Sequence, residues 1–304
     1  GRAMKAAFLY TGQGFQYKHM LRELPDCESM RRILKEAQEI LNCDIRELDT
    51  EEGIRSNENT QICIFLCERI WSEWIRERWD CQIVSGHSIG SFSAAVEAGA
   101  LDFEQALRLV QIRGRHMEHL FPEGYGMMAV EGMTSGLMEQ VLGSFTSQES
   151  GRAVFLAAVN GQTQCVISGD RDSLNRLNAY IHKDYPARTH LLSVKVPSHS
   201  PLMEPVEKRL AESCQEIYWK KAGLPYLSNS RGRRVWNSQQ IKEDLIQGVS
   251  HTVRWYEGIS LMKELGVERF IEIGPARVLT EIGRKNAPEL CWLTGREALN
   301  FRER

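Results

Sequence analysis

Residues 86–90, Gly-His-Ser-Ile-Gly, constrain the fold of this chain more than any other segment, because they lie between an apolar run and an alanine-rich run. The apolar run at 82–86, "QIVSG", has the pattern of a buried strand, and the residues after Gly90 have the composition of a helix. A G-x-S-x-G sequence at such a junction is typical of a nucleophile elbow, a tight turn that lifts the serine hydroxyl to the start of the helix. Backbone N–H groups at that position can receive a developing oxyanion. The segment therefore predicts an α/β protein in which Ser88 is a nucleophile.

Strand-like and helix-like segments alternate along the 304 residues, which is typical of a parallel sheet covered by helices. Short apolar runs at 6–10, 82–86 and 269–274 predict strands, and residues 61–77 predict a helix. A chain of this length can form one large domain or two modest ones. We therefore expect an α/β fold.

Residues 126–195 have a different pattern from the rest of the chain. Four strand-like runs at 126–132, 153–161, 164–169 and 189–196 are interspersed with helix-like segments after the first and third runs. The order βαββαβ predicts a small ferredoxin-like subdomain inserted into the larger one. We therefore expect a catalytic subdomain made of residues 4–125 and 196–304, with residues 126–195 as the insert.

The charge and cysteine content exclude several classes of protein. A formal net charge of -2 provides no overall field that would attract nucleic acid, and no uncharged apolar run approaches the length needed to span a bilayer. The eight cysteines are scattered without a CxxC pair, which favours reduced thiols. We therefore expect a cytoplasmic protein that has no metal site and binds neither nucleic acid nor membrane.

A serine nucleophile needs a base, which is usually a histidine. His87 adjoins Ser88, but successive side chains diverge at a sharp turn, so His87 is a weak candidate. His199, in "VKVPSHSPLM" at 194–203, lies where the predicted insert ends. On this pattern alone, a structural role and a catalytic role for His199 are equally supported.

An arginine on the helix predicted at 101–120 is a third candidate. Asp102 is expected to cap this helix, with Gln105 three residues later. Arg113 falls in the middle of an apolar face, which is formed by Phe103, Ala106, Val110, Met117 and Leu120. A buried guanidinium needs an anion or other acceptors. Two partners are possible, an internal acidic residue or the carboxylate of a substrate held by a bidentate fork.

The chain resembles the malonyl-CoA:acyl-carrier-protein transacylase family, including the acyltransferase domains of fatty-acid and polyketide synthases. Five landmarks in order carry the resemblance: "YTGQGFQ", "GHSIG", "QIRGRHM", "VPSHSPLM" and "HTVRW". The resemblance implies an α/β-hydrolase-like large subdomain, with the active site in the cleft between it and the insert. It assigns the nucleophile to Ser88, the base to His199, the carboxylate-binding residue to Arg113, and the oxyanion hole to the backbone N–H groups of Gln13 and Ile89.

The resemblance also implies the substrates. Malonyl-CoA is the expected acyl donor, and the phosphopantetheine-type arm of an acyl carrier protein is the expected acceptor, with no permanently bound cofactor. His87, Tyr125 and Asn160 are expected to contact the substrate together with Arg113. The implied reaction is a ping-pong malonyl transfer catalysed by a serine–histidine dyad.

Three stretches are most similar to the malonate decarboxylase epsilon subunit: residues 91–118, "GYGMMAV" with Tyr125, and "YLSNSRGR" at 226–233. This narrower resemblance implies other malonate decarboxylase subunits as partners. The chain departs from the general family at Gly248, seven residues before the Trp of "HTVRW", where the family has Gln. A backbone carbonyl at this position orients the catalytic histidine in the family, and any residue can supply one.

Three alternative functions remain at this stage. The first is a trans-acting malonyl transacylase of fatty-acid or polyketide synthesis. The second is a serine thioesterase or acyl hydrolase, which would need an acid between the nucleophile and the histidine in the sequence; Asp170, Asp172 and Asp184 are available. The third is a non-catalytic module that binds carrier proteins, but such a module would not need Ser88, His199 and Arg113 together.

Overall fold

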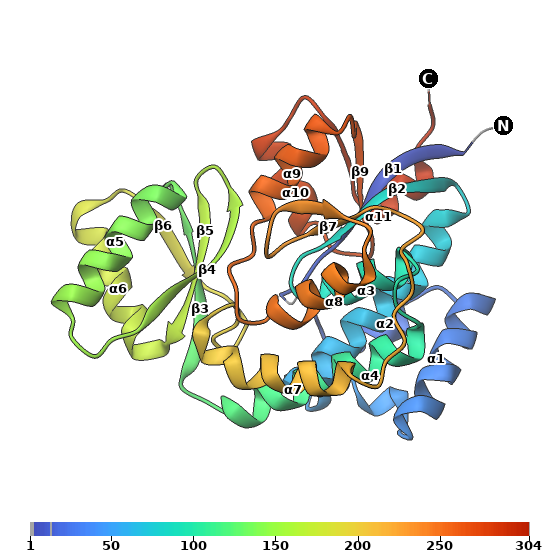
Figure 1. Cartoon of the computed structure of the whole chain (residues 1–304), viewed down its shortest axis with the longest axis horizontal. Helices are drawn as coiled ribbons and strands as arrows, with labels where there is room; N and C mark the ends of the chain where they lie inside the picture. Colours follow the sequence, from blue (N-terminus) through green and yellow to red (C-terminus); the bar gives the residue numbers. More distant parts are fainter. Residues whose placement is uncertain (1–2, 13, 304) are drawn as a thin grey trace.

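The computed structural model describes residues 3–12 and 14–303, which form a large and a small lobe (Figure 1). The large lobe contains a six-stranded sheet of order β10-β9-β1-β2-β7-β8. Its strands are parallel except at one edge, where β7 and β8 pair antiparallel. The strands are β1 (Met4–Tyr10), β2 (Trp79–Gly86), β7 (Tyr226–Ser228), β8 (Arg233–Val235), β9 (Arg269–Glu272) and β10 (Cys291–Leu293).

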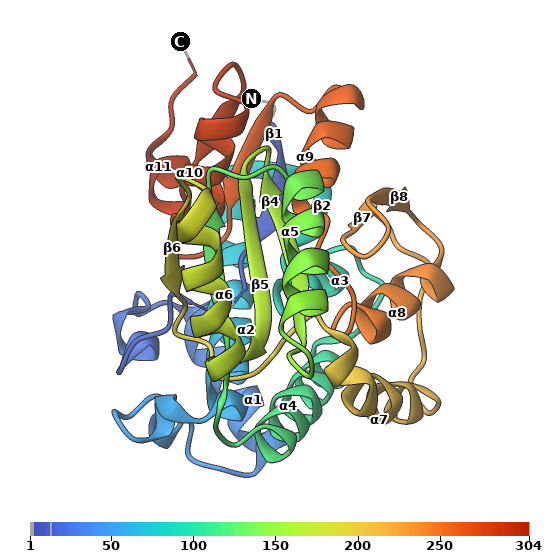
Figure 2. The same ribbon diagram turned by 90° about the vertical axis from the view of Figure 1, so that its left-hand side faces the viewer.

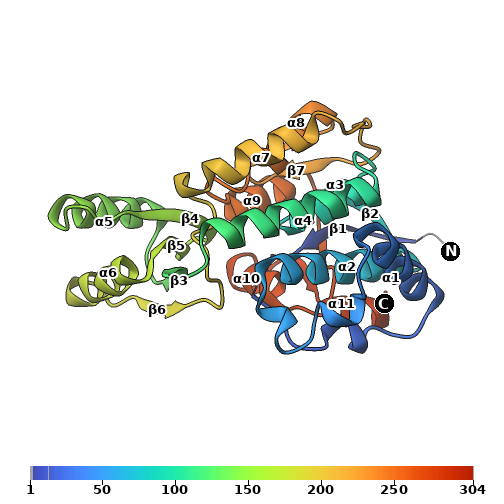
Figure 3. The same cartoon turned by 90° about the horizontal axis from the view of Figure 1, so that it is seen from below.

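Helices pack around this sheet, as the view from below shows (Figure 3). Residues 6–10 of the central strand β1 have no exposed surface. A strand with neighbours on both sides and helices over its faces is a continuous apolar run rather than an alternating one, which explains "AAFLY". The helices are α1 (Glu28–Leu41), α2 (Asn57–Arg76), α3 (Gly90–Glu97), α4 (Phe103–Leu120), α7 (Glu204–Cys214), α8 (Ser238–Gln247), α9 (Trp255–Glu264), α10 (Val278–Asn286) and α11 (Gly295–Asn300).

The small lobe has the element order βαββαβ. Its four strands form an antiparallel sheet of order β4-β5-β3-β6. Helices α5 and α6 cover the face turned away from the large lobe, so the other face is left toward it (Figure 2). The elements are β3 (Tyr125–Glu131), α5 (Ser135–Gln148), β4 (Val154–Gly161), β5 (Gln164–Asp170), α6 (Arg171–Asp184) and β6 (Arg188–Leu191).

Side-chain alternation along β3 separates the two faces of the small sheet. Met128 and Val130 belong to a hydrophobic cluster with α5 and α6, whereas Met127 and Ala129 line a cavity between the lobes. Successive side chains of a strand point to opposite faces. The short run "GMMAVEG" therefore supplies both the core of the small lobe and one wall of the cavity.

Three local expectations from the sequence were wrong. The strand expected at 189–196 is β6, which ends at Leu191, so the segment before His199 is an extended loop rather than a strand. Helix α4 begins after Asp102 as expected, but the Asp102 carboxylate makes no capping hydrogen bond. It binds the Lys220 ammonium at 2.6 Å instead. Leu120 is exposed because it is the last residue of α4, beyond the packed part of the apolar face.

The structure also shows the state of the cysteines and whether any described helix could span a membrane. All eight cysteines are free; four of them are buried, including Cys63 and Cys67 in α2, and the other four are partly buried. Burial raises the pKa of the Cys63 and Cys67 thiols, so both are held as neutral apolar groups. Within residues 3–12 and 14–303, none of the helices combines the length and the apolar character needed to cross a bilayer.

Candidate active site

The turn between β2 and α3 holds Ser88 in a left-handed backbone conformation with φ of 59°. Non-glycine residues seldom adopt this conformation, and its strain is typical of functional sites. A Cβ on Gly86 would lie 2.1 Å from the carbonyl carbon of Gly90, and a Cβ on Gly90 would lie 2.2 Å from the carbonyl oxygen of Tyr10. Both glycines are therefore required by close backbone contacts, and the turn has the tight geometry that the sequence predicts for an elbow.

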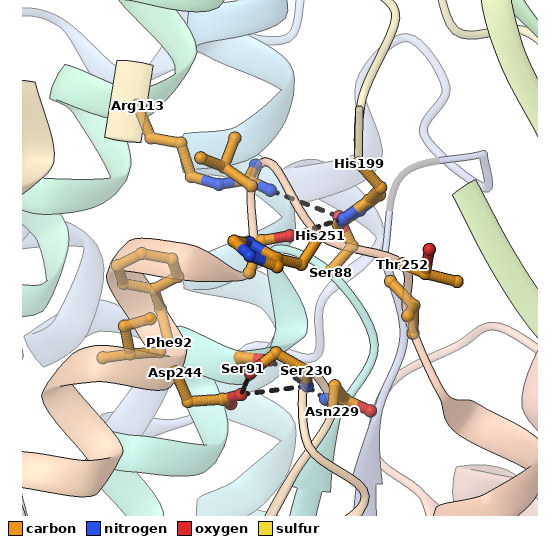
Figure 4. A pocket seen from close by; sticks show the side chains of 14 residues that line it. Ser88, Ser91, Phe92, Arg113, His199, Asn229, Ser230, Asp244, His251 and Thr252 are labelled. Atoms are coloured by element: carbon orange, nitrogen blue, oxygen red, sulfur yellow. Dashed lines mark hydrogen bonds between the residues drawn. The ribbon is translucent and has the colours of Figure 1, made fainter. Parts of the chain in front are cut away.

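His199 meets Ser88 from the loop that follows the small lobe. Its Nε2 lies 2.8 Å from the Ser88 Oγ, and its Nδ1 lies 2.6 Å from the carbonyl oxygen of Gly248. Since a carbonyl only accepts, Nδ1 carries the proton and Nε2 is free to accept the serine proton. The structure thus brings together the two residues expected to form the dyad (Figure 4). The Gly248 carbonyl orients the histidine.

The protonation of His199 is set by its surroundings. Burial lowers its pKa from the ordinary 6.5 to about 3, with further lowering by Arg113 and His87. The hydrogen bond to the Gly248 carbonyl acts in the opposite direction. His199 is therefore neutral at physiological pH, as a general base must be.

Arg113 reaches the same point from α4 and is 2% exposed. Its Nη1 donates to the Gln61 Oε1 at 2.8 Å, and its Nη2 donates to the Ser88 Oγ at 3.3 Å. Within the part of the chain that the structure describes, it forms no ion pair with Asp or Glu. Burial lowers the pKa of Arg113 to about 10. The internal ion pair left open by the sequence is absent among these residues, and the guanidinium remains available to an incoming anion.

His87 points away from Ser88 toward the small lobe. Its Nε2 lies 2.7 Å from the Asn160 Oδ1 at the end of β4, and its ring packs against Trp255 with centroids 5.5 Å apart. Burial lowers the pKa of His87, so this ring is held neutral. His87 and Asn160 both line the cavity beside Ser88, but neither contacts the Ser88 hydroxyl.

The remaining predicted site residues are placed as follows. Tyr125 lines neither of the two cavities at Ser88; its ring packs edge-on against Phe121 at 4.9 Å, so the structure does not bring it to the site. Ile89 directly follows the nucleophile and precedes α3, where its N–H can face an oxyanion. Gln13 lies outside the described residues.

A cavity of about 560 Å³ connects Ser88 and His199 to the space between the lobes. Its walls are mostly apolar, and the polar residues that line it include Ser88, His199, Asn160, Glu281 and Lys285. An apolar cavity of this size with a few polar groups is typical of a site for a small molecule or a cofactor arm. The arrangement can therefore hold an extended acyl chain with its reactive carbon at Ser88.

Sequence reasoning missed Gln61, which accepts a hydrogen bond from Arg113 inside α2. The only signal in the sequence was an amide residue at the start of the apolar run 61–77, which the structure buries fully. The three acids considered for a hydrolase triad do not reach His199. Asp170 caps α6 through the Ser173 N–H, Asp172 pairs with Arg152, and Asp184 ends α6.

Comparison with known proteins gives consistent matches over nearly the whole chain. The family model described as "Acyl transferase domain" matches residues 7–290. The "Malonyl CoA-acyl carrier protein transacylase" of Bacillus subtilis is 34% identical over 287 residues, covering 92% of this chain and 90% of that protein. The crystal structure of FabD from Acinetobacter baumannii superposes with a TM-score of 0.90 at 27% identity, covering 98% of both chains. PlMCAT, solved with the type II PKS acyl-carrier protein AntF, superposes with a TM-score of 0.86 at 28% identity, covering 98% of this chain and 99% of that one.

Proposed function

The chain belongs to the acyl transferase domain family, and we propose that it moves a malonyl group from malonyl-CoA to the thiol of an acyl carrier protein. The observation that carries this proposal is Arg113, a buried guanidinium 3.3 Å from the nucleophile and without an acidic partner among the described residues. An acyl group with a free carboxylate would provide the missing partner through two parallel hydrogen bonds. An acetyl group would leave the charge unpaired.

The first half-reaction acylates the enzyme. The Ser88 Oγ attacks the thioester carbonyl of malonyl-CoA while the His199 Nε2 takes its proton. The N–H of Ile89 stabilises the oxyanion. The C–S bond then breaks, and the departing CoA thiolate takes the proton back from His199.

The second half-reaction transfers the malonyl group to the carrier. The thiol of the carrier's phosphopantetheine-type arm gives its proton to the His199 Nε2 and attacks the Ser88 ester carbonyl. The ester C–O bond breaks, and the Ser88 oxygen recovers the proton from His199. Arg113 holds the malonyl carboxylate through both halves, so the acyl group does not shift between the two attacks.

Two features support transfer by a dyad over hydrolysis by a triad. The His199 Nδ1 is bound to the Gly248 carbonyl, so no carboxylate is needed to orient the ring. The cavity of about 560 Å³ is mostly apolar and has room for an acyl arm that displaces water from the ester.

The relatives favour one pathway alternative over the other. Those named above are malonyl-CoA transacylases, and one of them was solved with a carrier protein of polyketide synthesis. These names support a trans-acting malonyl transacylase of fatty-acid or polyketide synthesis better than the malonate decarboxylase epsilon subunit suggested by three stretches of sequence. The other malonate decarboxylase subunits therefore have no support as partners.

We also infer that the lobes correspond to an α/β-hydrolase-like subdomain, residues 4–125 and 196–304, and a ferredoxin-like insert, residues 126–195. The insert's sheet order, β4-β5-β3-β6, and its separate hydrophobic cluster support this assignment.

The test is intact-protein mass spectrometry after brief mixing with equal concentrations of malonyl-CoA and acetyl-CoA. We expect a malonyl adduct on the wild-type protein and none on Ser88→Ala. Transfer of the adduct to an added holo carrier protein would complete the cycle. Steady release of CoA without an adduct would instead identify a hydrolase and overturn the proposal.

A further inference from the structure

A buried carboxylate beside the dyad has no part in the reaction steps above. Asp244, in α8, is 4% exposed, and its carboxylate accepts four hydrogen bonds from residues 226–230, which include β7. Its four donors are the Tyr226 hydroxyl at 2.5 Å, the Ser228 hydroxyl at 2.6 Å, the Ser230 hydroxyl at 2.6 Å and the Ser230 N–H at 3.0 Å. A buried charge is tolerated where donors satisfy it to this extent. The stretch "YLSNS" is thus fixed to α8 by one side chain.

The same segment is attached to the nucleophile elbow. The Asn229 Nδ2 donates to the carbonyl oxygen of Gly86, and it also lies 3.2 Å from the Ser91 hydroxyl, which itself donates to the Gly86 carbonyl at 2.8 Å. Gly86 and Ser91 flank Ser88 on its two sides. Asn229 therefore holds both arms of the turn that presents the nucleophile, and Asp244 holds the residues on either side of Asn229.

Asp244 is also linked through the end of α8 to His199. Gly248 follows Asp244 by one helical turn, and its N–H donates to the Asp244 carbonyl at 2.8 Å. Its own carbonyl accepts from the His199 Nδ1 at 2.6 Å, and the His199 N–H donates to the Val249 carbonyl at 2.9 Å. A Cβ at position 248 would lie 2.7 Å from the Asp244 carbonyl oxygen, so a side chain there would have to shift this turn.

We propose that Asp244 is a positioning residue for the reaction, because it fixes the nucleophile elbow and the carbonyl that orients His199 to one another. Ser88 and His199 lie on separate segments, and the 2.8 Å contact between them depends on how those segments are held. Figure 4 shows Asp244, Ser230, Asn229 and Ser91 as a connected group beneath the dyad. Small errors in the placement of reacting groups are costly in rate.

The test compares Asp244→Asn with Glu243→Gln, a partly exposed neighbour that pairs with Arg231 and accepts a hydrogen bond from the Gln239 amide. The inference rests on the proposed function only for the nature of the acyl group, so the dyad is also probed with a fluorophosphonate, which reacts with activated serines regardless of acyl specificity. We expect Asp244→Asn to slow labelling of Ser88 by about tenfold or more. The rate of malonyl-enzyme formation should fall by the same factor, with the KM for malonyl-CoA within about twofold of wild type, because Arg113 does not contact this network.

A second variant protects the test against a folding defect. Asn229→Ala removes the link to Gly86 while leaving the Asp244 carboxylate and its four donors intact. It should slow labelling in the same direction, and the double variant should be no slower than the slower single variant, because both changes interrupt one connection. Urea unfolding of each protein establishes the folded fraction.

Two results would overturn the inference. The first is a fully folded Asp244→Asn protein that labels at the wild-type rate. The second is labelling lost only in proportion to the unfolded fraction, which would make Asp244 a purely structural residue. Wild-type protein that labels with fluorophosphonate but forms no malonyl ester would refute the proposed function alone, and Asp244 would still be judged by its labelling rate.

Discussion

Replacing Arg113 with methionine should make the protein more stable and at the same time remove its preference for malonyl groups. Arg113 is a charged side chain in an apolar interior, and the substrate rather than the protein supplies its anionic partner in the proposed reaction. Such a residue is kept for function at a cost in stability. Methionine fills much of the same volume without a charge, so the substitution leaves a smaller cavity than alanine would.

The size of the stability gain follows from the pKa of Arg113. A decrease from the ordinary 12.5 to about 10 corresponds to about 3 kcal/mol by which burial disfavours the charged guanidinium. The substitution also leaves the Gln61 Oε1 without its donor, which costs about 1 kcal/mol. We therefore expect Arg113→Met to raise the free energy of unfolding of the ligand-free protein by about 2 kcal/mol at neutral pH.

The selectivity change follows from the lost charged hydrogen bonds. Hydrogen bonds to charged groups contribute roughly 1.5–3 kcal/mol, so loss of the fork should reduce the ratio of malonyl to acetyl acylation by about a hundredfold. Urea unfolding measures the first effect, and competition between the two CoA esters measures the second. Arg115→Met is the matched control, because Arg115 lies on the exposed side of α4 and pairs with Glu58 at 2.8 Å. It should change the free energy of unfolding by less than about 1 kcal/mol and leave selectivity intact.

An Arg113→Met protein that is less stable than wild type would show that internal acceptors already satisfy the guanidinium. Unchanged malonyl preference in the same protein would show that the carboxylate binds elsewhere. Either result refutes the reasoning that assigns Arg113 to the substrate.

Four further predictions concern the dyad and the turns that hold it. Because the pKa of His199 in the folded protein is about 3, kcat/KM should persist well below pH 6.5. A bound substrate carboxylate offsets the charge of Arg113, so the acid limb of kcat should lie at higher pH than the acid limb of kcat/KM. Profiles of both rate constants against pH measure these two effects. Below about pH 6.5 the unfolded state takes up a proton on His199 and the folded state does not, so the free energy of unfolding should fall by about 1.4 kcal/mol per pH unit toward pH 3. The decrease should be smaller in a His199→Gln protein. Unfolding measured at a series of acidic pH values compares the two proteins. Gly86→Ala should yield no folded protein by circular dichroism, because its Cβ would overlap the Gly90 backbone; a folded, active variant would contradict the assigned turn. Gly248→Ala should fold yet acylate more slowly, and an unchanged acylation rate would show that its carbonyl need not be placed so tightly.

Several parts of the site could be predicted from sequence because they depend on local rules. The elbow follows from glycines at positions where the backbone allows no side chain, so "GHSIG" specifies its own geometry. The position of Arg113 on the buried side of α4 follows from the 3.6-residue period of the helix. The βαββαβ order of the small lobe follows from alternation and turn residues.

Other parts could not be predicted because they depend on contacts between distant segments. Whether His199 is structural or catalytic was undecided by its local pattern, and the 2.8 Å contact with Ser88 joins residues 111 positions apart. Tyr125 was expected at the site through resemblance, but the packing of its ring on Phe121 leaves it outside both cavities. The Asp102 carboxylate follows a capping pattern, but Lys220, 118 positions away, binds it instead.

The sequence by itself determined which residues could do chemistry: a serine in a strained turn, a histidine in a loop and an arginine on an apolar face. Each is set by backbone sterics or by the period of one element, and both act over a few residues. Only the tertiary structure decided that the three converge, that Arg113 has no acidic partner among the described residues, and that Asp244 joins the elbow to the helix that orients His199. The physical reason is that hydrogen-bond partners and burial are properties of the packed chain, where segments far apart in sequence meet within 3 Å.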